Sequence, residues 1–282
     1  MYTLFILLTL SFNFLSIFGL VASLLIGLSL GLIGGGGSIL TVPVLVYLFR
    51  VDPVLATAYS LFIVGITSLI GTYPKYKEGL VNVKTALIFG APSIVMVFLT
   101  RKYIVPAIPF ELFTTASFTL TKSMLLMLLF ALLMIAASFS MIRDKKSPNR
   151  NSAAESISFN YPLIMAEGTI VGLLTGLVGA GGGFLIIPAL VLLTKLPMKE
   201  AVGTSLLIIA AKSLIGFLGD LSQQKMDWIL LAIVSSMAVI GIFIGNNWSK
   251  KIDGQKLKKG FGWFVLTMGV YILFKESTGG AH

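Results

Sequence analysis

The sequence is a succession of apolar runs, most of them close to the 20 or so residues that a helix needs to cross a bilayer. They extend over about 2–33, 39–49, 54–73, 85–100 and 123–142, and then over 162–178, 184–194, 201–219, 228–248 and 261–274. Only 11% of the 282 residues are charged, and the mean hydropathy is +0.98. A soluble domain carries about 25% charged residues. The sequence therefore predicts a polytopic membrane protein.

Each run should be helical, because inside lipid every backbone polar group needs a partner within the protein. A membrane barrel would instead show alternating segments of about ten residues, and the sequence has none. The predicted fold class is all-α: a transmembrane bundle of about eight helices in two homologous halves, with helices broken by glycine.

The basic residues, which give a formal net charge of +10, stand in short clusters between the apolar runs. Lys75 with Lys77 and Arg101 with Lys102 are two such pairs. Clusters in this position contact anionic lipid headgroups and fix orientation. We interpret all of them in this way, so membrane lipid is an expected partner and nucleic acid is not.

Cysteine is absent, and the only histidine is His282. This composition excludes a Cys/His metal site and thiol chemistry. An intramembrane enzyme would need a histidine, a cysteine or paired carboxylates within its spans, and Glu167 is the one carboxylate there. We therefore predict no catalytic residue, no metal and no cofactor.

An internal repeat becomes visible when the second half is set against the first with a shift of 145 positions. From Gly31 to Gly71, 18 of 41 aligned positions are identical without a gap. The predicted organisation is a first repeat over 1–142, a polar linker over 143–160 and a second repeat over 161–282. Duplicated halves are typical of transporters. Four passes per half, which we favour, would make the repeats parallel, whereas an odd number would make them inverted.

Two glycine clusters occupy matching places in the halves, and each should break its helix because glycine costs about 1 kcal/mol relative to alanine in a helix interior. A fresh helix after each break would present N–H groups to an anion. The predicted substrate site therefore contains Gly34, Gly35, Gly36, Gly37 and Ser38 from the first cluster, and Gly179, Gly181, Gly182 and Gly183 from the second. The alternative is that these glycines only allow close helix packing.

Polar residues inside the spans complete the candidate site. Lys212 and Glu167 are the charged residues that fall well inside apolar runs, and a buried lysine suits an anion pocket. The alternative is that Lys212 snorkels or pairs with Glu167, which should lie near an interface. Hydroxyls of Ser60, Thr204 and Ser205 could bond to ligand oxygens, although such hydroxyls often bond to their own backbone. We place Ser60 and Ser205 at helix starts.

The segments Gly-Leu-Ile-Gly-Gly-Gly-Gly-Ser-Ile-Leu-Thr-Val-Pro (31–43) and Gly-Leu-Val-Gly-Ala-Gly-Gly-Gly-Phe-Leu-Ile-Ile-Pro (176–188) resemble the duplicated signature of the sulfite exporter TauE/SafE family. Ala-Val-Gly-Thr-Ser-Leu (201–206) resembles the helix start that follows it. The resemblance implies an eight-helix permease of the bacterial inner membrane for sulfite, sulfonates or related anions. The loop over 101–122 and Lys212 depart from the family pattern.

The sequence thus predicts a secondary transporter for a small anion, coupled to a proton, ion or substrate gradient, since no nucleotide-binding motif is present. Two alternatives stay open. The glycine breaks could line an anion channel, or the permease could carry a small carboxylate without sulfur.

Overall fold

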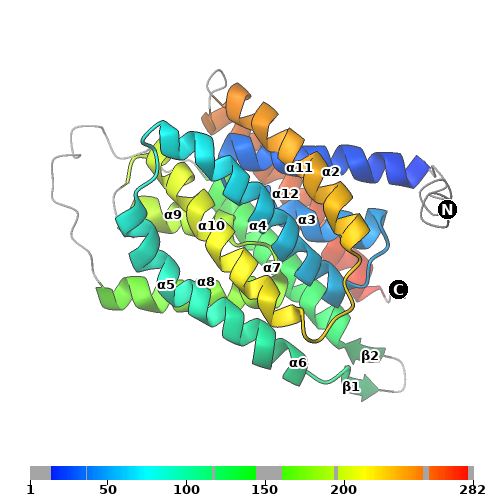
Figure 1. Cartoon of the computed structure of the whole chain (residues 1–282). Helices are drawn as coiled ribbons and strands as arrows, with labels where there is room; N and C mark the ends of the chain where they lie inside the picture. Colours follow the sequence, from blue (N-terminus) through cyan, green and yellow to red (C-terminus); the bar gives the residue numbers. More distant parts are fainter. Residues whose placement is uncertain are drawn as a thin grey trace, which may run out of the picture.

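The computed structural model of this chain describes residues 14–35, 37–115, 118–143, 161–193, 196–249 and 254–278. In this part of the chain, helices pack side by side into a bundle (Figure 1). Gly36 of the first glycine cluster lies outside the described residues. Residues 144–160, which make up nearly all of the predicted linker, lie outside them too.

The first half forms α2 (Phe14–Ile33), the short α3 (Ser38–Pro43) with its π-helical continuation η1 (Val44–Leu48), and the long α4 (Pro53–Lys77). Next come α5 (Val83–Leu99), the π-helical η2 (Thr100–Ile104) and α6 (Val105–Ala107), and then α7 (Lys122–Ile142). The second half forms α8 (Tyr161–Val178), α9 (Gly183–Leu193), α10 (Met198–Asp220), α11 (Trp228–Trp248) and α12 (Gly254–Ser277).

The shift of 145 residues found in the sequence reappears in three pairs of helix starts, which are Ser38 with Gly183, Pro53 with Met198, and Val83 with Trp228. The last pair also shares its cap. Asn82 accepts a hydrogen bond from the Thr85 backbone N–H, and Asp227 accepts from Ile229 and Leu230. Side-chain caps of this kind satisfy the first N–H groups of a helix.

The helices pack in pairs that cross from one half of the sequence to the other: α2 on α11, α5 on α8, α4 on α10 and α7 on α12. Close approach depends on glycine. A Cβ at Gly27 would overlap the backbone of Ala238 on α11, and a Cβ at Gly172 would lie 2.6 Å from the Ser93 carbonyl oxygen on α5. These two contacts are related by the same shift of 145 positions. Small residues bring membrane helices together in this way.

Helices that correspond between the halves run in opposite directions. Gly71 near the end of α4 lies beside Leu206 near the start of α10, and Gly216 near the end of α10 lies beside Leu61. Helices α12 and α7 are antiparallel as well, because Gly262 contacts Met141 whereas Gly269, farther along α12, contacts the earlier residue Met134. The parallel direction implied by the four-pass arrangement that we favoured from the sequence is therefore not found in these pairs.

The physical reason lies in the short helix after the first break. A Cβ at Gly37 would meet Ser29 and Leu30 of α2, and farther along the chain the Phe49 ring packs against Gly19. The segment α3–η1 thus returns beside α2 instead of crossing to the far side. Helix α4 consequently starts at the same end of the bundle as α2.

Between α6 and α7 the chain forms a hairpin of β1 (Glu111–Thr115) and β2 (Phe118–Thr121), paired antiparallel. The hairpin lies at one end of the bundle (Figure 1). It occupies the loop that departs from the family pattern, and it was not predicted. The bundle itself is all-α, as the sequence predicted.

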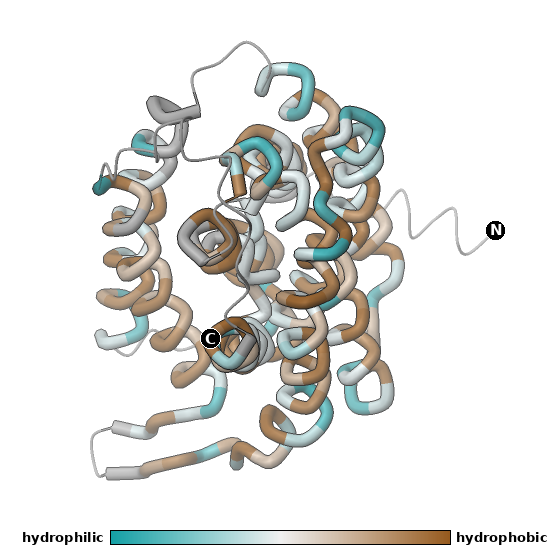
Figure 2. The backbone as a smooth tube through the Cα atoms, turned by 90° about the vertical axis from the view of Figure 1, so that its left-hand side faces the viewer, coloured by the Kyte–Doolittle hydropathy of each residue, from teal (hydrophilic) through white to brown (hydrophobic). Residues whose placement is uncertain are grey.

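Five described helices are long and apolar enough to cross a membrane: Pro53–Lys77, Val83–Ala107, Lys122–Phe139, Met198–Asp220 and Trp228–Trp248. Large apolar side chains also face outward, including Leu87 at 66% and Phe274 at 70% exposure. Figure 2 shows hydrophobic residues along the helices and hydrophilic residues gathered towards their ends. The protein is a multi-pass membrane protein, because such a surface needs lipid as its solvent.

Candidate functional site

The two glycine breaks meet in the interior of the bundle. A Cβ on Gly35 would overlap the backbone of Gly183, and a Cβ on Gly183 would overlap the backbone of Gly35. Positive φ angles, between 64° and 87°, occur at Gly34, Gly179, Gly181 and Gly182. Residues other than glycine rarely adopt this backbone conformation. The two glycine segments lie between α2 and α3 and between α8 and α9, and the fold brings them into direct backbone contact.

A short helix starts at each break. The Leu40 backbone N–H donates to the Gly37 carbonyl oxygen at 3.1 Å as α3 begins. The Leu185 and Ile186 N–H groups donate to the Gly182 carbonyl oxygen as α9 begins. The first N–H groups of a helix have no acceptor within that helix. Ser38 at the start of α3 and Gly183 at the start of α9 are buried, so their N–H groups are held away from lipid.

Lys212 reaches the second break from α10. Its side chain is fully buried, and its Nζ donates to Thr175 Oγ1 at 3.1 Å. A Cβ at Gly182 would lie 2.6 Å from this Nζ, so glycine at this position leaves the ammonium against the backbone. Among the described residues no carboxylate forms an ion pair with Lys212. An ammonium has three donors, and only one of them is directed at Thr175.

Glu167 is not the partner of Lys212. It lies on α8 eight residues before Thr175, which is about 12 Å along a helix. Its side chain is only partly buried. The structure therefore places Glu167 away from the break, as the sequence predicted.

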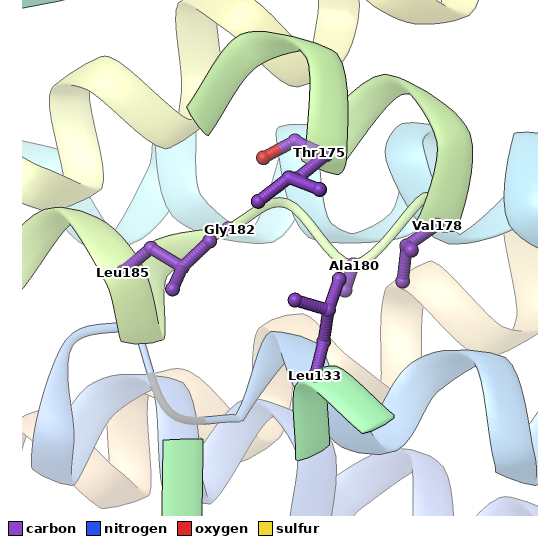
Figure 3. Close-up of a pocket in the computed structure, with 7 residues that line it drawn as sticks. Leu133, Thr175, Val178, Ala180, Gly182 and Leu185 are labelled. Carbon is purple, nitrogen blue, oxygen red and sulfur yellow. The ribbon is translucent and has the colours of Figure 1, made fainter. Parts of the chain in front are cut away.

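A narrow gap opens beside the second break (Figure 3). Its lining includes Thr175, Val178, Ala180 and Gly182 from α8 and the break, with Leu133 of α7 across from them. The gap is too narrow for a water molecule. A larger apolar cavity of about 230 Å³ lies elsewhere, between α2, α3–η1 and α12.

The three hydroxyl residues predicted on α4 and α10 differ in their hydrogen bonds. Ser60 and Ser205 are each the eighth residue of their helices, α4 and α10, so our placement of them at helix starts was wrong. The Ser60 hydroxyl is buried without a hydrogen-bond partner, whereas Ser205 donates to the Val202 carbonyl oxygen. Thr204 accepts a hydrogen bond from the Asn82 backbone N–H at 2.9 Å, away from the breaks.

Ser60 belongs to the face of α4 that lines the second break. Thr57, one turn before it, packs against Gly179, and Val64, one turn after it, packs against Gly181. Residues spaced three and four apart share a helix face. Ser38, predicted at the first break, packs against Gly181 too, and its hydroxyl donates to the Gly35 carbonyl oxygen at 2.8 Å.

Arg101 was assigned to the headgroups from the sequence, and that assignment was wrong. Its side chain is fully buried where η2 packs between α4, α8 and α10. Nη1 donates to Thr57 Oγ1 at 3.0 Å and lies 3.5 Å from Asp220 Oδ2. The apolar run appeared to end at Thr100, but the helix continues to Ala107, which draws Arg101 inside the span.

The shift of 145 positions maps Arg101 onto Asn246 and Asp220 onto Lys75. Both counterparts are also buried, at the opposite end of the bundle: Asn246 is 6% exposed and Lys75 is 8% exposed. Neither amide atom of Asn246 has a hydrogen-bond partner. Each end of the bundle therefore holds buried polar groups at corresponding positions.

Comparisons with known proteins agree with this architecture. The chain matches the sulfite exporter TauE/SafE family over residues 19–272. A probable membrane transporter protein of Xylella fastidiosa is 27% identical over 89% of this chain and 92% of its own length. The probable membrane transporter protein YdhB of Bacillus subtilis is 27% identical over 89% of this chain and 97% of its own.

A further relative, the probable membrane transporter protein YunE of Bacillus subtilis, is 28% identical and covers 94% of this chain. No solved structure matches the chain. A family match over nearly the whole bundle, joined to relatives covered along almost their full length, leaves one assignment: the chain belongs to the sulfite exporter TauE/SafE family of membrane transporters.

Proposed function

We propose that this protein is a secondary transporter that carries a small sulfur oxyanion, such as sulfite or a sulfonate, without chemically changing it. The proposed substrate site lies where the two glycine breaks meet. The observation that carries the proposal is the position of Lys212, whose buried Nζ lies against Gly182 in the second break.

The chemistry of this site favours an anion. Inserting a charged lysine near the middle of a span costs about 2.5–3.5 kcal/mol on insertion scales, and a bound anion would offset this cost. The nearby starts of α3 and α9 add N–H groups, which attract negative charge. Thr175, Ser38 and Ser60 supply hydroxyls around the same breaks. A cation would meet the Lys212 ammonium without a carboxylate to balance it.

The substrate class rests on the family, whose description names sulfite. The site geometry alone favours an oxyanion and does not separate sulfite from a carboxylate, since both present oxygens to N–H donors. The proposal for sulfur therefore draws on the comparison, and the proposal for an anion draws on the site.

The arrangement of the helices supports alternating access. The antiparallel pairs α4–α10 and α7–α12, with the reciprocal glycine contacts, support two inverted repeats around the breaks. Transporters built from inverted repeats expose a central site to each side in turn. A gap beside the break that is too narrow for water supports a carrier over an open anion channel.

The test is uptake of [³⁵S]sulfite and [³H]taurine into proteoliposomes, with and without a proton gradient, by wild type and Lys212→Met. The matched control is Lys199→Met, which changes an exposed lysine of the same helix. We expect saturable uptake that falls at least about tenfold in Lys212→Met, as loss of one charged hydrogen bond implies, and is unchanged in the control.

Three results would contradict the proposal. Folded wild type that moves neither anion would refute sulfur oxyanion transport. Uptake of acetate in preference to sulfite would assign the carrier to carboxylates. Uptake that does not saturate, and that exceeds carrier rates by orders of magnitude, would identify a channel.

A further inference from the structure

We propose that Arg101 forms a second oxyanion-binding station on the transport pathway, where the Nε–Nη2 edge of its guanidinium holds two oxygens of the passing anion. This inference rests on the proposed function, because it gives the same substrate class a second place to bind. Arg101 lies outside the glycine breaks and was not among the predicted site residues.

One edge of the guanidinium is engaged, and the other is free. Nη1 donates to Thr57 Oγ1 at 3.0 Å and faces Asp220 Oδ2 at 3.5 Å. Nε and Nη2 are buried without any hydrogen-bond partner. More than nine in ten buried polar groups have such a partner. The free edge is therefore an unfilled pair of charged donors.

The geometry of that edge selects its ligand. Nε–H and the neighbouring Nη2–H point the same way in the guanidinium plane, which matches two oxygens of one oxyanion. A halide presents one atom, so both N–H groups must bend towards it and neither hydrogen bond is well aligned. The chemical class is thus an anion with two accessible oxygens, such as sulfite or a sulfonate.

Thr57 connects the station to the second break. A Cβ at Gly179 would overlap the backbone of Thr57, the same residue whose hydroxyl holds Nη1. On the opposite side, a Cβ at Gly219 would lie 3.0 Å from Arg101 Cβ. Movement of α8 at the break would therefore reach Arg101 through direct contact with α4.

Asp220 acts as the internal counter-ion that the substrate must displace. Its Oδ2 lies 3.5 Å from Nη1 and has no hydrogen-bond partner, so the pair is a loose one. Lys122 interacts electrostatically with Arg101, Asp220 and Asp52. Asp52 is occupied in capping α4, where it accepts from two backbone N–H groups. Asp220 is therefore the carboxylate that competes with an incoming anion.

The experiment measures equilibrium binding of [³⁵S]sulfite to purified protein, together with its competition by chloride. The variants are Arg101→Lys, which keeps the charge but loses the paired donors, and Asp220→Asn, which removes the competitor. Arg143→Lys, at an exposed arginine, is the control. Sulfite flux in proteoliposomes is measured on the same proteins.

We expect Arg101→Lys to bind sulfite about ten- to a hundredfold more weakly, in line with the loss of a charge-assisted hydrogen bond. The variant should also discriminate less between sulfite and chloride. Asp220→Asn should bind sulfite more tightly than wild type. Opposite effects of the two variants are the signature of the station. Equal losses in both, with lower melting temperatures and unchanged selectivity, would leave only a structural ion pair and overturn it.

Removing one partner of a buried pair can prevent folding. If either single variant fails to fold, the double variant Arg101→Gln with Asp220→Asn decides, since it removes both charges. Wild-type sulfite affinity and selectivity in the double variant would overturn the station, and loss of the preference over chloride would support it. Wild type that binds sulfite while Arg101→Lys is unaffected refutes the station alone. Wild type that neither binds nor carries sulfite refutes the proposed function as well.

Discussion

Gly35 and Gly183 lie backbone to backbone, and neither leaves room for a Cβ between them. They come from different breaks and are separated by 148 positions in the chain (183 − 35). The contact fixes how closely α3 and α9 approach, so it sets the dimensions of the proposed site.

The first prediction therefore concerns Gly35→Ala. The added methyl must push the two breaks apart, and overpacking of this kind costs about 1–3 kcal/mol. We expect a lower melting temperature and a loss of sulfite uptake. Gly90→Ala is the control, because Gly90 is buried as Gly35 is, but lies in α5 and has its nearest neighbouring atom at 3.7 Å. Similar uptake by the two variants would show that the approach of the breaks does not matter.

A second prediction tests the direction of the helices with single cysteines, which are clean probes because the chain has no cysteine. Arg50 and Lys225 lie next to the start of α4 and the end of α10, and Lys77 and Lys199 lie at the opposite ends of these helices. An impermeant maleimide should label Arg50→Cys and Lys225→Cys from one side, and Lys77→Cys and Lys199→Cys from the other. Labelling of Arg50→Cys and Lys199→Cys from the same side would contradict the inverted arrangement.

Thr204→Val provides a third prediction. The Thr204 hydroxyl accepts from the backbone N–H of Asn82, the residue whose side chain caps α5. Its removal leaves that N–H without its partner, at a cost of about 1–3 kcal/mol. We expect the melting temperature to fall while the KM for sulfite stays constant. A raised KM at unchanged stability would return Thr204 to the substrate site.

Ser60→Ala should behave in the opposite way. The buried hydroxyl has no partner, so its loss should change the free energy of unfolding by no more than about 0.5 kcal/mol. Because Ser60 shares the α4 face that lines the second break, we expect the KM for sulfite to rise several-fold. An unchanged KM would exclude this hydroxyl from the pathway.

The sequence predicted the apolar spans and the family, since these depend on runs and repeats that are visible along the chain. It also placed Lys212 inside a span. It could not show that Gly35 meets Gly183, because the contact depends on how α3 turns back beside α2. The same turn explains why the sequence favoured a parallel direction for α4 and α10, which run in opposite directions.

Arg101 was missed for a related reason. An arginine at the end of an apolar run next to Lys102 has the pattern of an interfacial cluster. Its burial depends on η2 and α6 prolonging the helix beyond Thr100, and on Thr57 and Asp220 arriving from other helices. Of the signals in the sequence, only the alignment of Arg101 with a second polar residue, Asn246, could have pointed to it.

That alignment is also unequal. Arg101 faces the Asp220 carboxylate at one end of the bundle, whereas the neutral amide of Asn246 shares the other end with the buried Lys75. A carrier that passes its cargo between these ends performs two half-cycles that differ in energy, although the helices around them follow one plan. Net flux still follows the gradient, but we expect the concentration that half-saturates the carrier to differ between the two sides. A duplicated scaffold would then support a transport cycle with two unequal halves.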